Sequence, residues 1–166
     1  MTLYSEPGHG TTVRLYLPRV EAEEESAEAV PIAAPLDTYR GHGETVLVVE
    51  DEPRVRRTSV ARLKSLGYRV LEAANGPAAL AVLETHPEVD VLFTDMVMPG
   101  GMTGADLATR VRALWPDVRV LFTSGYAEPD VVRQGQVDGA RWLKKPHTAV
   151  ELARTLRTVI VKAATS

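Results

Sequence analysis

Acidic, hydroxyl and basic side chains follow directly after four short apolar runs of this sequence, and together they could bind a cation and receive a phosphoryl group. The four groups are Glu50-Asp51-Glu52, Asp95, Thr123-Ser124 and Lys144-Lys145-Pro146. Carboxylates that are gathered in one place repel one another unless positive charge compensates them. Glu50, Asp51 and Asp95 outweigh the single charge of Lys145, and a divalent cation would balance the remainder. Oxygen ligands of this kind suit Mg²⁺.

Asp95 is the member of this set that could act as a nucleophile. Its carboxylate is ionised at neutral pH and can form an aspartyl phosphate. Mg²⁺ and the Lys145 ammonium would neutralise the transferring oxygens, and the Thr123 hydroxyl would donate a hydrogen bond to one of them. Each residue also has a plainer role when taken alone. Glu50 and Asp51 could cap a helix, and Thr123 could simply end a strand. Only their convergence at one place predicts a site.

The pattern from Thr45 onward predicts how these side chains are brought together. Five apolar runs, at residues 46–49, 69–71, 91–93, 118–122 and 141–143, alternate with segments of helical periodicity. Three of the runs are apolar on both faces, as a parallel sheet covered by helices on each side requires. The alternation predicts a doubly wound α/β domain, in which the C-terminal ends of all strands lie along one edge.

Five helices are expected between and after these strands. The first begins near Pro53 and is closed by Gly67, in keeping with the preferred places of proline and glycine in helices. The second is expected at about 77–85, the third at 105–114 with Leu107, Val111 and Leu114 inward, the fourth at about 129–136 and the last at 149–160.

Composition excludes several classes of protein. The sequence contains no cysteine, so disulfides and thiolate chemistry are absent, which suits a cytoplasmic location. No apolar run approaches the roughly 20 residues of a membrane span, and no secretory signal precedes the first strand. The net charge of −3 argues against non-specific binding to nucleic acid.

The first 44 residues read as two further segments. Residues 5–11 have turn chemistry, and Val13, Leu15 and Leu17 alternate with polar residues as in a half-buried strand. With Ser5-Glu6-Pro7 before it and Leu17-Pro18 after it, Gly8-His9-Gly10-Thr11 resembles the end of the ATP-binding domain of sensor histidine kinases. Residues 1–19 are therefore interpreted as a remnant of that domain, too short to bind ATP. Residues 20–44, acidic and then rich in alanine and proline, are expected to be a linker.

Residues 45–166 resemble the receiver domain of two-component response regulators. The matching pieces are residues 48–52, 94–99, 123–125 and 143–146. The resemblance implies a flavodoxin-like five-stranded sheet with strand order 2-1-3-4-5. It also implies a role for each site residue: Asp95 as the phosphoacceptor, Glu50 and Asp51 as the acidic pair at the Mg²⁺, the backbone carbonyl of Val97 as a further metal ligand, Thr123 and Lys145 as phosphoryl contacts, and Thr123 with Trp142 as the switch. Glu50 replaces the commoner aspartate, which leaves open whether it contacts the metal directly.

Taken together, these features predict the C-terminal part of a hybrid sensor histidine kinase. The expected phosphoryl donor is a phosphohistidine on a histidine kinase or a phosphotransfer protein, and the expected output is a protein partner on the face of the fourth helix, fifth strand and fifth helix. Three alternatives remain: a free-standing response regulator, a Mg²⁺-dependent phosphohydrolase with an aspartate nucleophile, and a flavin-binding module. Val97 occupies the place where the phosphohydrolase needs a second carboxylate, and the acidic run after the first strand would repel a flavin phosphate.

Overall fold

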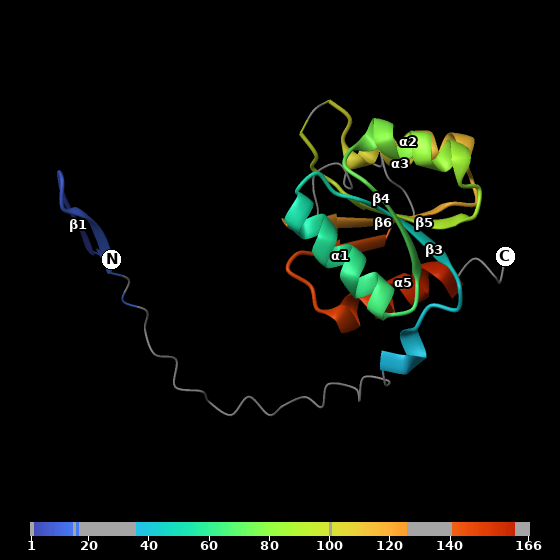
Figure 1. Ribbon diagram of the computed structural model, residues 1–166, viewed down its shortest axis with the longest axis horizontal. Helices are drawn as coiled ribbons and strands as arrows, with labels where there is room; N and C mark the ends of the chain where they lie inside the picture. The colour runs from blue at the N-terminus through green and yellow to red at the C-terminus, as the bar shows by residue number, and fades with distance from the viewer. Residues whose placement is uncertain (1, 15, 17–35, 100, 126–140, 162–166) are drawn as a thin grey trace. The chain divides into compact units, whose positions relative to one another are not determined.

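The computed structural model describes residues 2–14, 16, 36–99, 101–125 and 141–161. The chain divides into two compact units, Met1–Ala33 and Ala34–Ser166 (Figure 1). Among the described residues, no helix combines the length and the apolar character that crossing a membrane requires.

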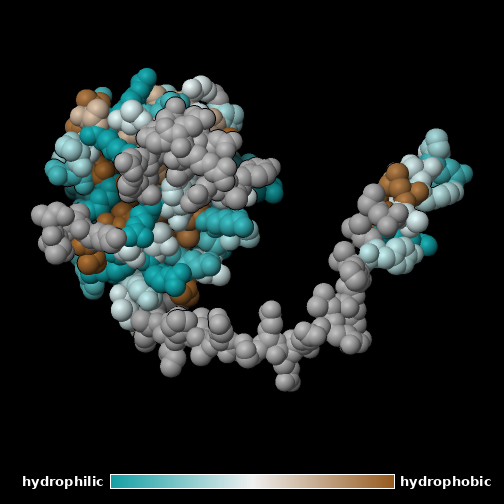
Figure 2. All heavy atoms as spheres, turned by 180° about the vertical axis from the view of Figure 1, so that it is seen from behind, coloured by the Kyte–Doolittle hydropathy of each residue, from teal (hydrophilic) through white to brown (hydrophobic). Residues whose placement is uncertain are grey.

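The first unit contains an antiparallel hairpin of β1 (Thr2–Glu6) and β2 (Gly10–Arg14). Gly8 and Gly10 have positive φ angles of 83° and 92°, which glycine adopts without strain. The prediction of a half-buried strand was wrong for the part described, because every residue of both strands is exposed. Leu3 and Val13 pair across the two strands and are both exposed, and Figure 2 shows hydrophobic atoms at the surface of this unit. Leu15 and Leu17, the other apolar residues of that prediction, lie outside the described residues.

The second unit is built on a five-stranded parallel sheet. Its strands are β3 (Thr45–Val49), β4 (Arg69–Ala73), β5 (Val89–Asp95), β6 (Arg119–Ser124) and β7 (Arg141–Lys144), in the spatial order β4-β3-β5-β6-β7. This order confirms the predicted 2-1-3-4-5 arrangement. β5 and β6 are in a register that sets Asp95 opposite Thr123, and β6 and β7 set Ser124 opposite Lys144. Residues that are distant in sequence therefore meet at one edge of the sheet.

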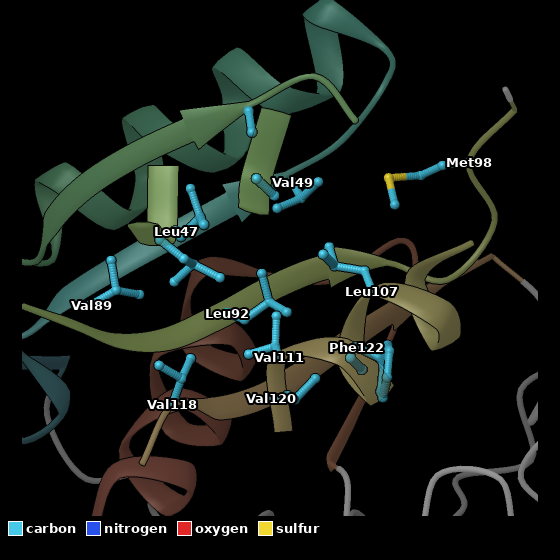
Figure 3. Packing of buried hydrophobic residues seen from close by; sticks show 14 of the residues in the cluster. Leu47, Val49, Val89, Leu92, Met98, Leu107, Val111, Val118, Val120 and Phe122 are labelled. Atoms are coloured by element: carbon cyan, nitrogen blue, oxygen red, sulfur yellow. The ribbon is translucent and has the colours of Figure 1, made fainter. Parts of the chain in front are cut away.

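Helices cover both faces of the sheet (Figure 1). α2 (Gly76–Thr85) and α3 (Gly104–Leu114) cover the apolar face that includes Leu47, Leu92 and Phe122 (Figure 3). α1 (Pro53–Ser65) and α5 (Ala149–Val161) cover the opposite face, whose core includes Val48, Phe93 and Leu121. Two buried layers explain why the central strands are apolar on both faces. The helix expected at 129–136 lies outside the described residues.

The ends of the helices follow from local chemistry. Pro53 is the first residue of α1, and the side chain of Glu52 before it accepts a hydrogen bond from the Arg54 amide. Thr103 and Asp106 form a reciprocal capping box at the start of α3. The prediction for the far end of this helix was wrong in one respect: Leu114 is 65% exposed, and Trp115, the next residue, packs against the core instead.

The second unit begins before the boundary that was predicted at residue 45. A single 3₁₀ turn, η1 (Leu36–Tyr39), precedes β3, and the Tyr39 carbonyl accepts a hydrogen bond from the Tyr68 hydroxyl at 3.2 Å. Glu44 forms an ion pair with Arg157 of α5 at 2.8 Å. The last residues of the expected linker are therefore packed against the sheet domain.

Candidate functional site

Three carboxylates meet at the C-terminal edge of the sheet. Glu50 and Asp51 follow β3 directly, and Asp95 is the last residue of the neighbouring strand β5. Each offers one oxygen atom, and these atoms all lie within 4.8 Å of one another. The structure thus brings together the three acidic residues that the sequence singled out, in an arrangement that could hold a metal ion.

Lys145 supplies positive charge to this cluster from the end of β7. Its Nζ lies 2.7 Å from Oε2 of Glu50 and 2.8 Å from Oδ2 of Asp95. Burial of the ammonium lowers its pKa, but the hydrogen bonds and charges of Asp95 and Glu50 outweigh this effect and leave the pKa raised. Lys145 is therefore a permanent cation at the site at physiological pH, bonded to two of the three carboxylates.

Glu50 has the most buried side chain of the residues in these ion pairs. Only 6% of the side chain is exposed. Burial raises its pKa, and the Lys145 ammonium offsets this only in part, while the Asp95 carboxylate raises it further. The cluster with its single lysine thus carries uncompensated negative charge, which a divalent cation could balance.

Thr123 lies beside Asp95 in the sheet and has an unsatisfied hydroxyl. Its Oγ1 is buried and has no hydrogen-bond partner among the described residues. A buried hydroxyl without a partner is costly, so a native structure that keeps one generally has a reason for it. The main chain around it is well held, because the Thr123 carbonyl accepts a hydrogen bond from the Met96 amide at 3.0 Å. The hydroxyl is therefore available to a group that enters next to Asp95.

Trp142 lies opposite Phe122 in the pairing of β6 and β7. The two rings are stacked, with centroids 4.6 Å apart and an angle of 21° between their planes. The indole is partly buried and packs against the core on the side of α2 and α3. Phe122, the partner of Trp142 in this contact, directly precedes Thr123 in β6.

Val97 lies in the loop after β5 and contributes a backbone contact. Its amide is 3.4 Å from Oδ1 of Asp95, and its side chain is 68% exposed. The position of Val97 beside the carboxylate is compatible with its carbonyl serving as a metal ligand, which remains a prediction.

Sequence reasoning missed two residues that shape the site. Gly104 opens α3 so close to β5 that a Cβ atom there would lie 2.1 Å from the Asp95 carbonyl oxygen, so no other residue fits. Arg56 of α1 reaches the main chain of the acidic pair. A glycine at the first position of a helix was a visible signal, whereas Arg56 looked like one of several surface arginines.

Comparisons with known proteins all point to one family. The family model described as the response regulator receiver domain matches residues 46–157. The sensor kinase CckA of Brucella abortus is 40% identical over 165 residues, which cover 95% of this chain but only 17% of that kinase. The response regulator receiver protein CpdR of the same bacterium is 32% identical over 124 residues, 71% of this chain and 98% of that protein.

A solved structure of the receiver domain from the hybrid histidine kinase CckA superposes with a TM-score of 0.59. The two sequences are 33% identical, and the match covers 70% of this chain and 98% of the solved chain. The sequence and structure comparisons both match the sheet domain to receiver domains.

Proposed function

This chain belongs to the response regulator receiver domain family of two-component signal transduction, and we propose that Asp95 is the residue that accepts the phosphoryl group. The observation that carries this proposal is the position of the Asp95 carboxylate. It lies beside two other carboxylates, is bonded to the Lys145 ammonium, which also bonds to Glu50, and is paired in the sheet with Thr123, whose hydroxyl has no partner among the described residues.

The reaction follows from this geometry. An Asp95 oxygen attacks the phosphorus of a phosphohistidine, a new oxygen–phosphorus bond forms, and the bond from phosphorus to the imidazole nitrogen breaks. The Lys145 ammonium, already 2.8 Å from the nucleophile, balances the charge of the incoming oxygens. Thr123 Oγ1 donates the hydrogen bond that it lacks in this structure to one of them.

Receiver domains bind Mg²⁺ at an acidic pocket, and the acidic cluster here fits that ion. We assign Glu50, Asp51, Asp95 and the carbonyl of Val97 as the groups that would hold it. Hard oxygen donors suit Mg²⁺, and the uncompensated charge of the cluster gives the ion a reason to bind. When bound, Mg²⁺ supplies further positive charge for the transferring oxygens.

We infer that the signal leaves the site through Thr123 and Trp142. When Thr123 moves to donate its hydrogen bond, the contact between Phe122 and Trp142 must adjust, because the rings and the threonine belong to adjacent positions of paired strands. The expected readers are protein partners on the face that includes β7 and α5. The histidine donor belongs to a kinase or phosphotransfer protein.

The similarity to CckA along 95% of this chain supports an origin in a hybrid kinase, since it extends beyond the receiver into the N-terminal unit. On this proposal, residues 1–19 are the last turn and strands of an ATP-binding domain, residues 20–44 connect it to the receiver, and the whole acts in the cytoplasm. An isolated two-stranded hairpin is marginally stable in water, and the full exposure of β1 and β2 agrees with a piece of a larger sheet.

An experiment that tests the proposed function is incubation with a small acyl phosphate and Mg²⁺, followed by mass spectrometry of the intact chain. We expect one added phosphoryl group in the parent protein and none without Mg²⁺. A phosphohydrolase would instead release phosphate continuously without holding it, and a flavin module would take up no phosphoryl group. A chain that stays unmodified at saturating donor would contradict the proposal.

A further inference from the structure

The side chain of Arg56 turns back from α1 toward the acidic pair. Its Nη1 donates hydrogen bonds to the main-chain carbonyls of Glu50, at 2.7 Å, and Asp51, at 3.4 Å. Its Nε donates to Oε2 of Glu72 in β4 at 3.2 Å. The guanidinium is therefore fixed from two sides, and only 18% of the Arg56 side chain is exposed. The neighbouring Arg57 is exposed.

The Glu50 and Asp51 carbonyls lie beyond the end of the strand pairing. The pairing of β3 with both of its neighbours ends at Val49, so Glu50 and Asp51 lie one and two residues beyond the paired strand. The Glu50 amide still donates to the Ala73 carbonyl, at 3.3 Å. Their own carbonyls need donors, since main-chain polar groups that leave water are nearly always paired. Arg56 supplies those donors.

Arginine suits this role for a geometric reason. Its planar fork of donors can bond to carbonyls on one side while its Nε bonds to a carboxylate on the other. The Glu72 carboxylate also neutralises the guanidinium. Because of this pairing, Arg56 can hold the main chain of the acidic pair while adding little positive charge where a cation is to bind.

We propose that Arg56 is a positioning residue for the metal site. It fixes the main chain of Glu50 and Asp51, and through it the two carboxylates that face Asp95, without contacting the metal or the phosphoryl group. This inference rests on the proposed function, because it concerns the assembly of the same Mg²⁺ site.

A positioning role and a purely electrostatic role of Arg56 predict opposite changes in Mg²⁺ affinity when its side chain is removed. A positive charge near a cation site repels the cation, so its loss should tighten Mg²⁺ binding if charge were all that mattered. If Arg56 instead holds the ligands in place, its loss should weaken binding, by about 10-fold or more, as for other groups that support metal ligands from outside. The phosphorylation rate at saturating Mg²⁺ should change much less, since Asp95, Lys145 and Thr123 keep their places.

The test compares Arg56→Met with the parent chain and with Arg57→Met. Both variants lose one positive charge from the same helix, but the Arg57 side chain makes no hydrogen bond or ion pair within the described part of the chain, so Arg57→Met controls for charge. The dissociation constant for Mg²⁺ is measured from the rise of the unfolding midpoint with Mg²⁺ concentration, and the phosphorylation rate is measured over the same range with a small acyl phosphate.

We expect Arg56→Met to raise the Mg²⁺ dissociation constant about 10-fold or more and to leave the saturated rate within about threefold of the parent value, with Arg57→Met close to the parent. Arg56→Lys keeps the charge but not the fork, so it should still bind Mg²⁺ more weakly than the parent. If Arg56→Met does not fold, Arg56→Lys replaces it in the comparison of Mg²⁺ affinity.

An unchanged or lower dissociation constant in the Arg56 variants, in a parent that binds Mg²⁺, would overturn the positioning role alone. A parent that neither binds Mg²⁺ nor becomes phosphorylated would contradict the proposed function itself.

Discussion

Neutralising Glu50 should stabilise the fold when Mg²⁺ is absent. In Glu50→Gln the shape of the side chain is kept and one of three clustered negative charges is removed. The other two carboxylates offer oxygens within 4.8 Å, and two such repulsions amount to about 7 kcal/mol at an effective dielectric constant of about 20. The attraction to Lys145 at 2.7 Å is about 6 kcal/mol on the same scale.

Because these charge interactions nearly cancel, desolvation decides the sign. The Glu50 side chain is almost completely buried, and a buried charge that is not fully compensated is costly. The raised pKa of Glu50 agrees with this reasoning, since it means that the fold favours the neutral form. We expect Glu50→Gln to gain on the order of 1 kcal/mol at pH 7, or roughly 4 °C in the unfolding midpoint of a domain of this size.

Mg²⁺ should reduce the stability difference between Glu50→Gln and the parent. At a concentration ten times its dissociation constant, the ion stabilises a protein that binds it by about 1.4 kcal/mol. Glu50→Gln lacks one charged ligand and should gain less than half as much. The assay is urea unfolding of both proteins, in a chelator and in Mg²⁺.

The stability that Glu50→Gln gains over the parent should increase with pH. Because the pKa of Glu50 is raised in the fold, its carboxyl costs nothing while it is protonated in both states, below its ordinary value of 4.5. The cost develops as the pH rises from 4.5 through the raised pKa, and it is complete above it. The stability of the variant relative to the parent should therefore grow over this range. A variant that is less stable than the parent in the chelator at pH 7, or a difference that does not change with pH, would refute the reasoning.

Three further predictions concern the rest of the site. Thr123→Val removes a buried hydroxyl without a partner, so it should stabilise the fold by about 1 kcal/mol in urea unfolding yet slow phosphorylation at least 10-fold; a loss of stability would contradict this. The fluorescence of Trp142, measured in a Trp115→Phe background, should change when a phosphoryl analogue binds, whereas an unchanged signal at saturation would indicate a packing role only. Val97→Asn places a polar group that can orient a hydrolytic water, so the phosphoryl group on Asp95 should be lost faster, by up to about 100-fold; an equal or longer lifetime would contradict the argument.

Periodicity was sufficient to predict the sheet domain. β3, β5 and β6 are buried on both faces, so their sequences are short apolar runs that few other structures require. The convergence of Asp95 and Lys145 followed from the same pattern, since both are polar residues at the point where such runs end. Parallel strands then bring these ends together whatever their separation in the sequence.

The predictions that the structure contradicts failed for physical reasons. Alternation predicted that the N-terminal strand would be half-buried, but alternation reports only which residues share a face, and nothing in the described structure covers the face of β2. Helical spacing placed Leu114 inward, although α3 ends there and the core is filled by Trp115. Arg56 could not be distinguished from Arg57, because its role depends on carbonyl groups and on Glu72, which the fold brings near it.

The central claim is that Asp95 accepts the phosphoryl group. The most direct measurement is tandem mass spectrometry of the chain after incubation with a small acyl phosphate and Mg²⁺, with borohydride reduction to mark the acyl phosphate site, on the parent and on Asp95→Asn. We predict one modified residue, Asp95, in the parent and no stoichiometric modification in Asp95→Asn. Modification at Glu50 or Asp51 in the parent, or stoichiometric uptake by Asp95→Asn, would contradict the account.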